Sequence, residues 1–233
     1  MVTVIVPTLN EAANILHLID GIYVALGPDA LVIVVDDSST DGTGEIVSKI
    51  ASERKTVRLI VRSKERGLGS AVRRGAREAR DGYIAVMDAD LSHNPKYLPE
   101  MFSKLDQGYD IVVGSRYIEG GKTEGWPGYR IAISRIATTI ARHLLHVKVK
   151  DPMSGYVACR DAHFLESGFQ HGGFKFLLEM IVRNRNLRAA EVPIVFRDRA
   201  RGKSKLHGIT VMLFVSLVLS LLFNFDLTEK RKA

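Results

Sequence analysis

Cysteine is almost absent from this sequence. Cys159 is the single copy, so no disulfide can form within the chain, which fits a reducing compartment. The first residues enter an apolar, strand-like run without a basic stretch or a cleavage site, and we therefore expect no secretion signal. Internal repeats and low-complexity segments are also missing, which argues against a solenoid.

Acidic residues are in the minority. The chain has 33 Lys and Arg against 26 Asp and Glu, which gives a net charge of +7 and a pI near 9.5. This surplus favours an anionic partner, such as nucleic acid, an acidic membrane surface or a phosphorylated substrate. Because the arginines are spread over several segments rather than massed among aromatic residues, we expect no nucleic-acid partner.

Short apolar runs alternate with segments of helical periodicity in the first half of the chain. The predicted strands cover residues 2–6, 31–35, 57–61, 83–87 and 110–113. The predicted helices cover residues 11–26, 70–80 and 99–107, with another passing through Ile46 and Ile50. This alternation predicts an α/β fold with a doubly wound, mainly parallel sheet, and 233 residues suffice for one sizeable core.

The second half is less regular. Its composition predicts a loop at 120–128, helices at 131–145 and about 175–184, a strand at 191–196 and a basic loop at 197–205.

An apolar segment at 209–225 would extend about 25 Å as a helix, just short of a typical hydrocarbon core. A full span would carry the basic tail at 230–232 across the membrane, against the positive-inside tendency. A helix in the membrane interface, or one docked on a partner's membrane segments, avoids this conflict, and a buried C-terminal helix is the alternative. We expect membrane contact, with a catalytic domain at 1–206 and a membrane-associating helix and basic tail at 207–233.

Two aspartates one residue apart end the fourth predicted strand. Alternation along a strand places Asp88 and Asp90 on the same side at its C-terminal end. Carboxylates this close repel each other unless a cation lies between them, and Mg²⁺ would also keep positions open for phosphate oxygens. Two solvated acids in a loop are the alternative, but open α/β sheets bind ligands at this edge, which favours a metal.

Polar loops follow the first two predicted strands as well. We expect Asn10 to cap the first helix and Glu11 to lie near the cleft. Acids in these loops could accept hydrogen bonds from a base edge or from ribose hydroxyls, with helix capping as the alternative. Capping alone is expected for Ser39, Thr40 and Asp41.

Together these elements resemble the inverting glycosyltransferases of the second sequence family, which have a GT-A fold and use nucleoside-diphosphate sugars. The matching segments are residues 4–11, 34–43, 67–71 and 88–93. A narrower similarity, to dolichol-phosphate (polyprenyl-phosphate) mannosyltransferases, adds residues 113–117, 151–156, 174–175 and 199–205. The resemblance covers residue 2 to about residue 206 and implies a GT-A fold.

The resemblance implies roles for individual residues on the donor side. Five residues would line a nucleoside pocket: Pro7, Leu9, Glu11, Val35 and Asp37. Asp88 and Asp90 would hold Mg²⁺ or Mn²⁺ against the donor diphosphate, with the backbone of Ala89 nearby. The resemblance also places Lys175 near the donor.

Ser92 departs from the family pattern. The family often has a glutamine at this position, and that side chain completes the metal shell. We count Ser92 among the metal ligands. Serine is shorter than glutamine, however, so a water molecule or His93 could supply this ligand instead. This departure bears on metal preference more than on activity.

A phosphate acceptor is already anionic, so it needs positioning and charge neutralisation rather than a general base. Arginine is suited to bidentate phosphate contact, and the matched motifs offer four cations: Arg116, Arg130, Arg199 and Lys205. Ser134, four residues after Arg130, could share its helix face and offer a hydroxyl. Asp151 could be a general base or a structural residue, and we favour a structural or phosphate-orienting role.

The candidate site residues fall into sets with different expected roles. The catalytic set is Asp88, Asp90, Arg116 and Arg199. Arg116, Arg199 and Lys205 would also contact the nucleotide sugar. The acceptor phosphate would meet Arg116, Arg130, Ser134 and Lys205.

The resemblance implies a membrane-associated, metal-dependent enzyme whose catalytic domain faces the cytoplasm. It would transfer mannose from GDP-mannose to a polyprenyl (dolichyl) monophosphate with inversion. Transfer from UDP-glucose or another UDP-sugar is the first alternative. A non-catalytic sugar-nucleotide-binding subunit and a soluble nucleotidyltransferase are alternatives of other classes. The implied partners are the nucleotide sugar, the lipid phosphate, the membrane and, as a further candidate, a separate membrane subunit.

Overall fold

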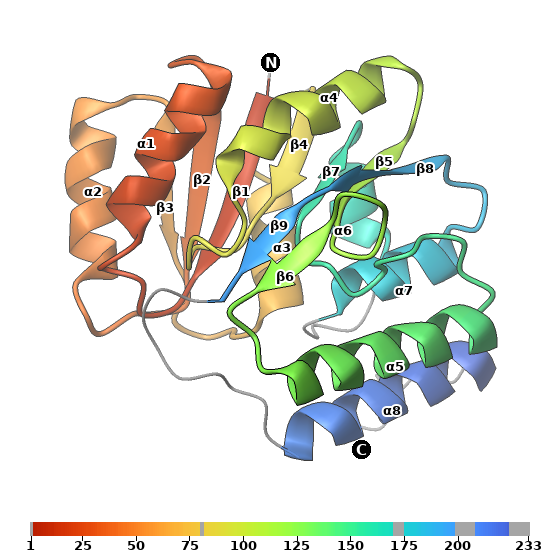
Figure 1. The fold of residues 1–233 in the computed structure, drawn as a ribbon. Helices are drawn as coiled ribbons and strands as arrows, with labels where there is room; N and C mark the ends of the chain where they lie inside the picture. The colour runs from red at the N-terminus through yellow and green to blue at the C-terminus, as the bar shows by residue number, and fades with distance from the viewer. Residues whose placement is uncertain (1, 80–81, 170–174, 199–207, 224–233) are drawn as a thin grey trace.

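A seven-stranded sheet forms the centre of the computed structural model, which describes residues 2–79, 82–169, 175–198 and 208–223. The strand order is β3-β2-β1-β4-β7-β5-β8, and β7 runs antiparallel to both of its neighbours (Figure 1). The strands are β1 (Val2–Thr8), β2 (Leu31–Asp36), β3 (Val57–Val61), β4 (Tyr83–Val86), β5 (Ile111–Ser115), β7 (Val157–Cys159) and β8 (Ala189–Pro193). The predicted α/β fold with a mainly parallel sheet is confirmed.

Helices cover both faces of this sheet. Neighbouring residues of a strand point to opposite faces, so β1 sends Val4 and Val6 into one core and Ile5 into the other. The first core is covered by α1 (Ile15–Leu26), α2 (Thr43–Glu53) and α4 (Leu98–Asp106), the last preceded by the short helix η1 (Pro95–Tyr97). The second core is covered by α3 (Leu68–Ala76), α6 (His163–Ser167) and α7 (Phe176–Arg183).

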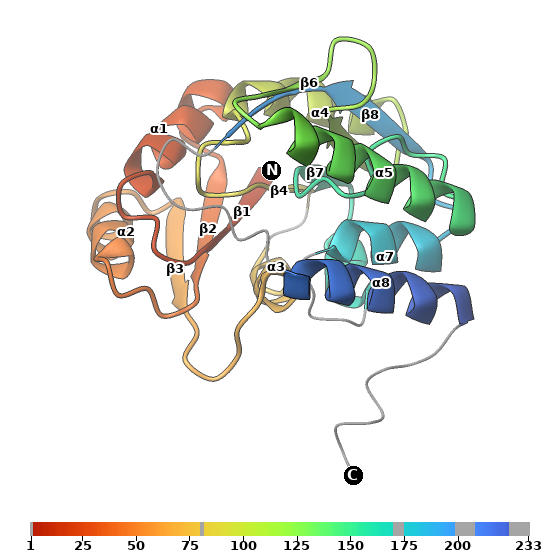
Figure 2. The same ribbon diagram turned by 60° about the horizontal axis from the view of Figure 1, so that its bottom comes forward.

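Two further helices, α5 (Gly128–Leu144) and α8 (Gly208–Phe223), lie on the side of the second core. Ala141 of α5 belongs to the same apolar cluster as Val218 and Leu221 of α8. Both helices run in the same direction along one side of the molecule (Figures 1 and 2). Within the described residues, no helix combines the length and the apolar character needed to cross a bilayer.

Close packing of α3 against the sheet depends on Gly75. A Cβ at this position would come within 2.5 Å of Cγ2 of Ile5, so a larger residue would push the helix outward. The helix therefore lies low enough for the backbone N–H of Gly67, just before it, to donate to Oδ2 of Asp37 at 2.9 Å. This contact joins the loop after β2 to the start of α3.

The region predicted as one strand at 191–196 divides at Ile194. Its backbone N–H donates to the carbonyl of Ser115, while its carbonyl accepts from the N–H of Lys122. The chain thereby leaves the main sheet, and β9 (Val195–Arg197) pairs with β6 (Lys122–Glu124) in a separate two-stranded sheet. The segment at 120–128, predicted as a loop, therefore contains a strand. Neither β7 nor α6 was predicted, because such short elements show no measurable periodicity.

Candidate active site

The carboxyl ends of β1, β2 and β4 meet at one edge of the sheet. Strand register pairs Thr8 with Asp36 and Ile5 with Val86, so the loops that follow these strands start side by side. Because β7 runs in the opposite direction, it begins at this same edge, and the segment 151–156 leads into it there. Because β7 is reversed, the segment 151–156 lies at the same edge of the sheet as the loops that carry the predicted acids.

Hydrogen bonds join the loops after β1 and β2. The N–H of Asn10 donates to Oγ of Ser39 at 2.8 Å, and its side-chain oxygen accepts from the N–H of Thr40 at 2.9 Å. Asp41 accepts from the N–H groups of Ala12 and Thr43. Asn10 is therefore not the cap of the first helix, which begins only at Ile15, and its φ of 60° places it in the left-handed region. These polar residues bind the two loops to each other, which corrects the expectation of capping alone.

Asp36, which ends β2, and Asp37, which follows it, are both buried and hydrogen-bonded. Asp36 accepts from Oγ1 of Thr8 at 3.1 Å and from the N–H of Ser39 at 2.9 Å. Asp37 accepts from Nε of Arg62 at 2.7 Å and also contacts Nη2 of that guanidinium. Oδ2 of Asp37, with one bond from Gly67, keeps acceptor capacity for a ligand. Arg62 is 7% exposed and was not predicted.

The other residues predicted for the nucleoside pocket differ in exposure. Leu9 is 40% exposed, and Pro7 and Glu11 are half-buried at the same edge. The carboxylate of Glu11 accepts from the amide of Asn14 at 2.8 Å. Val35 is 0% exposed within the second core, so only its backbone is in a position to meet a nucleoside.

Asp88 and Asp90 present two different carboxylates. The side chain of Asp88 is 35% exposed and lies against Gly155, where a Cβ would come within 3.3 Å of Oδ1. Asp90 is 4% exposed, and its Oδ1 accepts from the N–H of Ser92 at 3.1 Å and from Oγ of Ser92 at 2.5 Å. The exposed carboxylate of Asp88 and the carboxylate of Asp90, which Ser92 holds in place, fit a hard cation that takes further ligands from phosphate and water.

A third protein ligand is not evident near this pair. Among the described residues, no group of three His, Cys, Asp or Glu side chains could hold a metal ion. The Ser92 hydroxyl is directed at Asp90, so it orients that carboxylate, and its place among the ligands stays a prediction. His93 is 2% exposed, stacks on Tyr156 at 4.9 Å, and accepts the backbone N–H of Asp88 through Nδ1.

Arg116 is bound to Asp151, and its charge also interacts with that of Asp88. Nε and Nη2 of Arg116 donate to the two carboxylate oxygens at 2.7 and 2.8 Å, and its backbone N–H donates to Oδ2 at 3.1 Å. Asp151 is 0% exposed. Burial alone would lower the pKa of Arg116, but the hydrogen bonds and charge of Asp151 raise it above its usual value. Asp151 therefore orients Arg116, as favoured from the sequence, and does not face a substrate as a base.

Lys175 belongs to the same electrostatic group. Its Nζ donates to the carbonyl of Met153 at 3.1 Å. Burial lowers the pKa of Lys175 to about 8, and repulsion from Arg116 acts in the same direction, while the charges of Asp151 and Asp88 oppose it. The lysine predicted to lie near the donor is thus within the electrostatic reach of Asp88.

Aromatic rings connect Arg116 to the start of α5. The ring of Trp126 lies 3.8 Å from Cζ of Arg130 and 5.7 Å from Cζ of Arg116. Both Nε1 of Trp126 and Nη1 of Arg130 contact Oδ1 of Asp198, at 3.1 and 3.4 Å. Ser134 accepts from the hydroxyl of Tyr117 at 2.7 Å. Arg116, Arg130 and Ser134 therefore lie along one chain of contacts.

Five contributors to this arrangement escaped sequence reasoning: Arg62, Tyr117, Trp126, Gly155 and Asp198. A signal existed for two of them, since Tyr117 and Gly155 lie inside the matched segments 113–117 and 151–156. Arg62 and Asp198 act through partners distant in sequence, and Trp126 joins its near neighbour Arg130 to the distant Asp198, so no local pattern reveals these contacts. Arg199 and Lys205 lie outside the described residues, so their predicted roles stay predictions.

The arrangement combines a carboxylate pair with buried acids and with cations. Asp37 is held by Arg62, and the charges of Arg116 and Lys175 interact with that of Asp88. Carboxylates that bind a divalent cation, together with nearby cations, are the means by which proteins stabilise a departing diphosphate.

Curated relatives and solved structures match most of this chain. A dolichol-phosphate mannosyltransferase of Pyrococcus furiosus is 42% identical over 217 residues, which is 92% of this chain and 61% of the relative. The chain thus spans under two thirds of that protein's length. An enzyme of the same name from Saccharomyces cerevisiae is 37% identical, with 91% of this chain and 84% of the relative covered.

The fold has a solved counterpart in glucosyl-3-phosphoglycerate synthase of Mycobacterium tuberculosis. Its complex with Mn²⁺, UDP and glucosyl-3-phosphoglycerate superposes with a TM-score of 0.68 at 22% identity, over 96% of this chain and 79% of that one. Another structure of the same enzyme contains Mg²⁺ and UDP. At this identity the likeness establishes the fold alone.

The sequence profile of one family, "Glycosyl transferase family 2", matches residues 3–179. That match includes the loops after β1 and β2, the aspartate pair, Arg116 and Asp151. The predicted family resemblance is confirmed, and this chain belongs to glycosyl transferase family 2.

Proposed function

We propose that this protein transfers mannose from GDP-mannose to a polyprenyl or dolichyl monophosphate with inversion. Identity of 37–42% to dolichol-phosphate mannosyltransferases, over more than nine tenths of this chain, carries the proposal. Polyprenol monophosphomannose synthase of Mycolicibacterium smegmatis, 36% identical, supports a polyprenyl acceptor. The product would be a β-linked lipid-phosphate mannose for glycan assembly.

On the donor side, the joined loops after β1 and β2 would hold the nucleoside. Asp37, fixed by Arg62, would offer Oδ2 to the base or ribose, while Leu9 and Pro7 supply apolar surface. Asp88 and Asp90 would hold Mg²⁺ or Mn²⁺, which neutralises the diphosphate as it departs. Lys175 would add a positive charge beside Asp88.

On the acceptor side, the phosphate would lie near Arg116, Arg130 and Ser134. An oxygen of this phosphate is already charged and attacks the anomeric carbon without a base, so these residues need only position it and reduce repulsion. The guanidinium of Arg116 is held by Asp151, which fixes its orientation before the acceptor arrives. Nε of Arg130 is buried and has no hydrogen-bond partner among the described residues, in line with a site that receives an anion.

A lipid acceptor places the enzyme at a membrane, with its site on the cytoplasmic face where it meets nucleotide sugars. Residues 1–206 would be the catalytic domain, and 207–233 a membrane-associating helix and basic tail. The helix α8 supports membrane contact because it is uncharged and keeps large apolar side chains exposed, including Met212, Leu219 and Phe223. A separate membrane subunit is a further candidate partner for it.

Labelled GDP-mannose and UDP-glucose, supplied one at a time with polyprenyl phosphate and Mg²⁺ or Mn²⁺, test this function. We expect label in the lipid fraction from GDP-mannose only. Transfer from UDP-glucose alone would overturn the mannose assignment. Donor binding without any transfer would indicate a non-catalytic subunit.

A further inference from the structure

A turn at residues 151–155 contacts three charged groups of the site. Its first residue, Asp151, holds the guanidinium of Arg116 through both carboxylate oxygens. The carbonyl of its third residue accepts from Nζ of Lys175, and its glycine lies against the carboxylate of Asp88. The position of this turn therefore sets where two cations and one acid of the site lie relative to one another.

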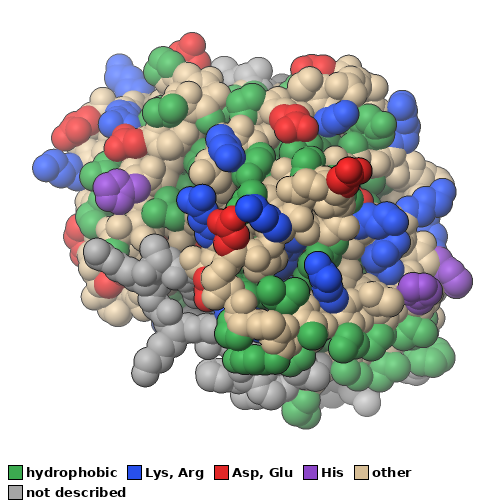
Figure 3. All heavy atoms as spheres, viewed as in Figure 1, with side chains coloured by type: hydrophobic (Ala, Val, Ile, Leu, Met, Phe, Trp, Pro, Cys, Tyr) green, Lys and Arg blue, Asp and Glu red, His purple; other side chains and the backbone are tan. Residues whose placement is uncertain are grey.

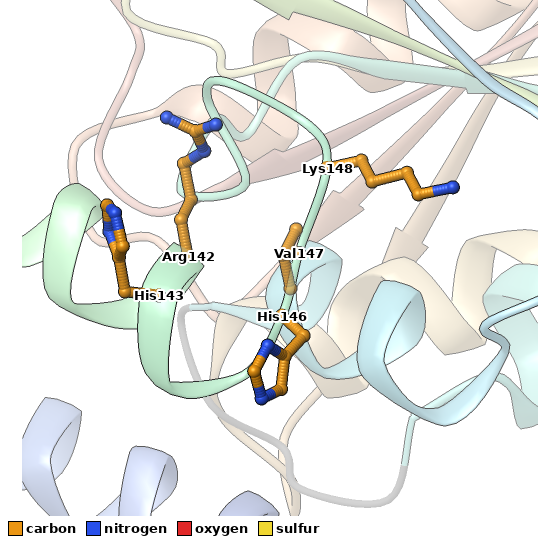
Figure 4. A pocket seen from close by; sticks show the side chains of 5 residues that line it. All are labelled: Arg142, His143, His146, Val147 and Lys148. Carbon is orange, nitrogen blue, oxygen red and sulfur yellow. The ribbon is translucent and has the colours of Figure 1, made fainter.

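A stretch of alternating burial leads from α5 into the turn. Val147 and Val149 are buried, whereas the residues beside them are exposed. Figure 4 shows the beginning of this stretch, where the side chains of His146 and Lys148 project away from each other. The same alternation directs Asp151 inward, and its side chain is fully buried. Because water cannot solvate this carboxylate, its position depends on the protein groups around it.

Glu191 fixes the entry to the turn. Its Oε2 accepts from the backbone N–H of Lys150 at 2.8 Å, and its Oε1 accepts from the backbone N–H of Asp151 at 3.0 Å. Its neighbour Val192 is buried in the first core, so the side chain of Glu191 lies on the other face of the sheet. Since β8 is the last strand of the sheet, Glu191 ties two consecutive N–H groups to the sheet edge.

The charges nearby make this use of a carboxylate informative. Lysine and arginine side chains predominate on the right-hand part of the face in Figure 3, where β8 and the end of α5 lie. A surface carboxylate there could pair with a cation, yet each oxygen of Glu191 accepts a backbone N–H, although Lys150 is exposed. An ionised acceptor makes stronger hydrogen bonds than a neutral one, so Glu191 is suited to holding a backbone segment.

Ser154 supports the turn from its other side. Its N–H donates to the carbonyl of Asp151 at 3.2 Å, and its Oγ donates to the carbonyl of Gly114 at 2.8 Å. These bonds remain when Glu191 is replaced, so the turn should still form. The backbone at Asp151 would then lose one of its supports, and the direction of the Arg116 guanidinium would be less strictly fixed.

We propose that Glu191 is a positioning residue for sugar transfer, which acts through the backbone of Asp151 on the orientation of Arg116. The inference rests on the proposed function, because that function assigns Arg116 to the acceptor phosphate. Its effect falls on the acceptor and not on the nucleoside, since the loops after β1 and β2 are held by their own hydrogen bonds.

Steady-state transfer to a short, soluble polyprenyl phosphate tests the proposal. Glu191→Ala should lower kcat/KM for this acceptor roughly a hundredfold, because a misplacement of about 1 Å in a positioned group has an effect of that order. The KM for GDP-mannose should stay unchanged. Glu191→Gln keeps one acceptor oxygen, so it should retain more activity than Glu191→Ala.

Asp110→Ala is the matched control. The carboxylate of Asp110 also accepts a backbone N–H, that of Arg188 at 2.8 Å, but it lies where β5 and β8 begin, away from the site. This variant should lose a similar amount of stability in thermal melts and keep wild-type transfer. Equal losses of transfer for Asp110→Ala and Glu191→Ala would mean that Glu191 has a structural role only, and so would a rise in the KM for GDP-mannose alone.

A double-mutant cycle tests the route through Arg116. Arg116→Lys keeps the charge but loses the forked contact to Asp151, so its direction no longer depends on the turn. Glu191→Ala should therefore lower transfer much less in the Arg116→Lys background than in the wild type. The same loss in both backgrounds would overturn the proposal.

Amide hydrogen exchange separates this inference from the proposed function, because it needs no sugar transfer. Glu191→Ala should speed exchange in the peptide that covers 150–156 and leave the peptide at 34–43 as in the wild type. Unchanged exchange at 150–156 would overturn the positioning role whatever the activity. A wild-type protein that transfers no sugar, with exchange responding as expected, would sink the proposed function and leave the tie between Glu191 and the turn in place.

Discussion

The two sides of the site are built in different ways. On the donor side, hydrogen bonds join the loops after β1 and β2, and Asp36 and Asp37 are both held by neighbouring donors. On the acceptor side, Arg116 and Arg130 lie against aromatic rings, and the Nε atom of Arg130 lacks a partner among the described residues. The donor side is thus preorganised, whereas the acceptor side retains bonding capacity for an incoming anion.

The carboxylate pair lies where the two sides meet, so its loss should have the largest effect. Asp90→Ala should lower transfer roughly a thousandfold, because several kcal/mol of charge stabilisation at the diphosphate would be lost. Steady-state transfer with Mg²⁺ and Mn²⁺ measures this, and Mn²⁺ binding in the presence of GDP provides a second readout. Asp29→Ala, at an exposed position, is the control. Full activity of Asp90→Ala with added Mn²⁺ would show that the metal assignment is wrong.

The buried pair between Arg116 and Asp151 tests how the acceptor side is held. Asp151→Ala leaves a buried guanidinium without its partner and should lower the free energy of unfolding by about 3 kcal/mol. Asp20→Ala breaks a solvent-exposed pair with Arg54 and should cost less than about 1 kcal/mol. Denaturant unfolding compares the two. Similar losses would contradict the view that Asp151 holds a desolvated cation.

Arg62 tests the rigidity of the donor side. Arg62→Lys keeps the charge but loses the contacts that Nε and Nη2 make with Asp37, so we expect the KM for the nucleotide sugar to rise about tenfold with little change in kcat. Arg58→Lys, on β3 four residues before Arg62 and with a side chain 41% exposed, is the matched control. A fall in kcat at unchanged KM would mean that Arg62 acts on the chemical step and not on donor binding.

The smallest expected effect is the dependence of kcat/KM on pH through the ionisation of Lys175. Its pKa of about 8 means that the cation is lost above that pH, so kcat/KM for the donor should fall on the alkaline side. At about pH 8.5 it should be roughly fourfold below its neutral value, as the protonated fraction requires. Lys175→Met should lower activity at neutral pH and remove this decline. A wild-type profile that stays flat to pH 9.5 would separate Lys175 from the donor.

The same pKa has an opposite consequence for stability. The native pKa of Lys175 is below that of the unfolded chain, so the unfolded state binds more protons between about pH 8 and pH 10.4. This group therefore contributes stability that increases with pH across that window. Lys175→Met should flatten the increase in a series of unfolding measurements.

Local patterns predicted much of the fold and part of the site. The strands ending near Val6, Val35 and Met87 are apolar runs bounded by turn residues. Strand alternation does not position Asp88 and Asp90, because β4 ends at Val86 and both aspartates lie in the segment beyond it. Pairings between distant residues were beyond such reasoning. Arg62 and Asp37 are 25 positions apart and Arg116 and Asp151 are 35 apart, so only the fold brings them into contact.

Short or interrupted elements account for the other differences. β7 and β9 each have three residues, and their strand character comes from neighbours that complete their hydrogen bonds. A glycine-rich sequence around Lys122 likewise becomes a strand because β9 lies beside it. In both cases tertiary pairing outweighs local propensity.

The reversed strand β7 affects the order in which the sheet and the site can form during synthesis. During synthesis, β1 to β4 emerge first and can form the β3-β2-β1-β4 half of the sheet with both nucleoside loops. Gly155, Asp151 and thus the fixed Arg116 come into place only when β7 inserts between β4 and β5. A nascent chain can therefore complete the joined loops after β1 and β2 first, whereas the contact between Arg116 and Asp151 forms only when that strand closes the sheet.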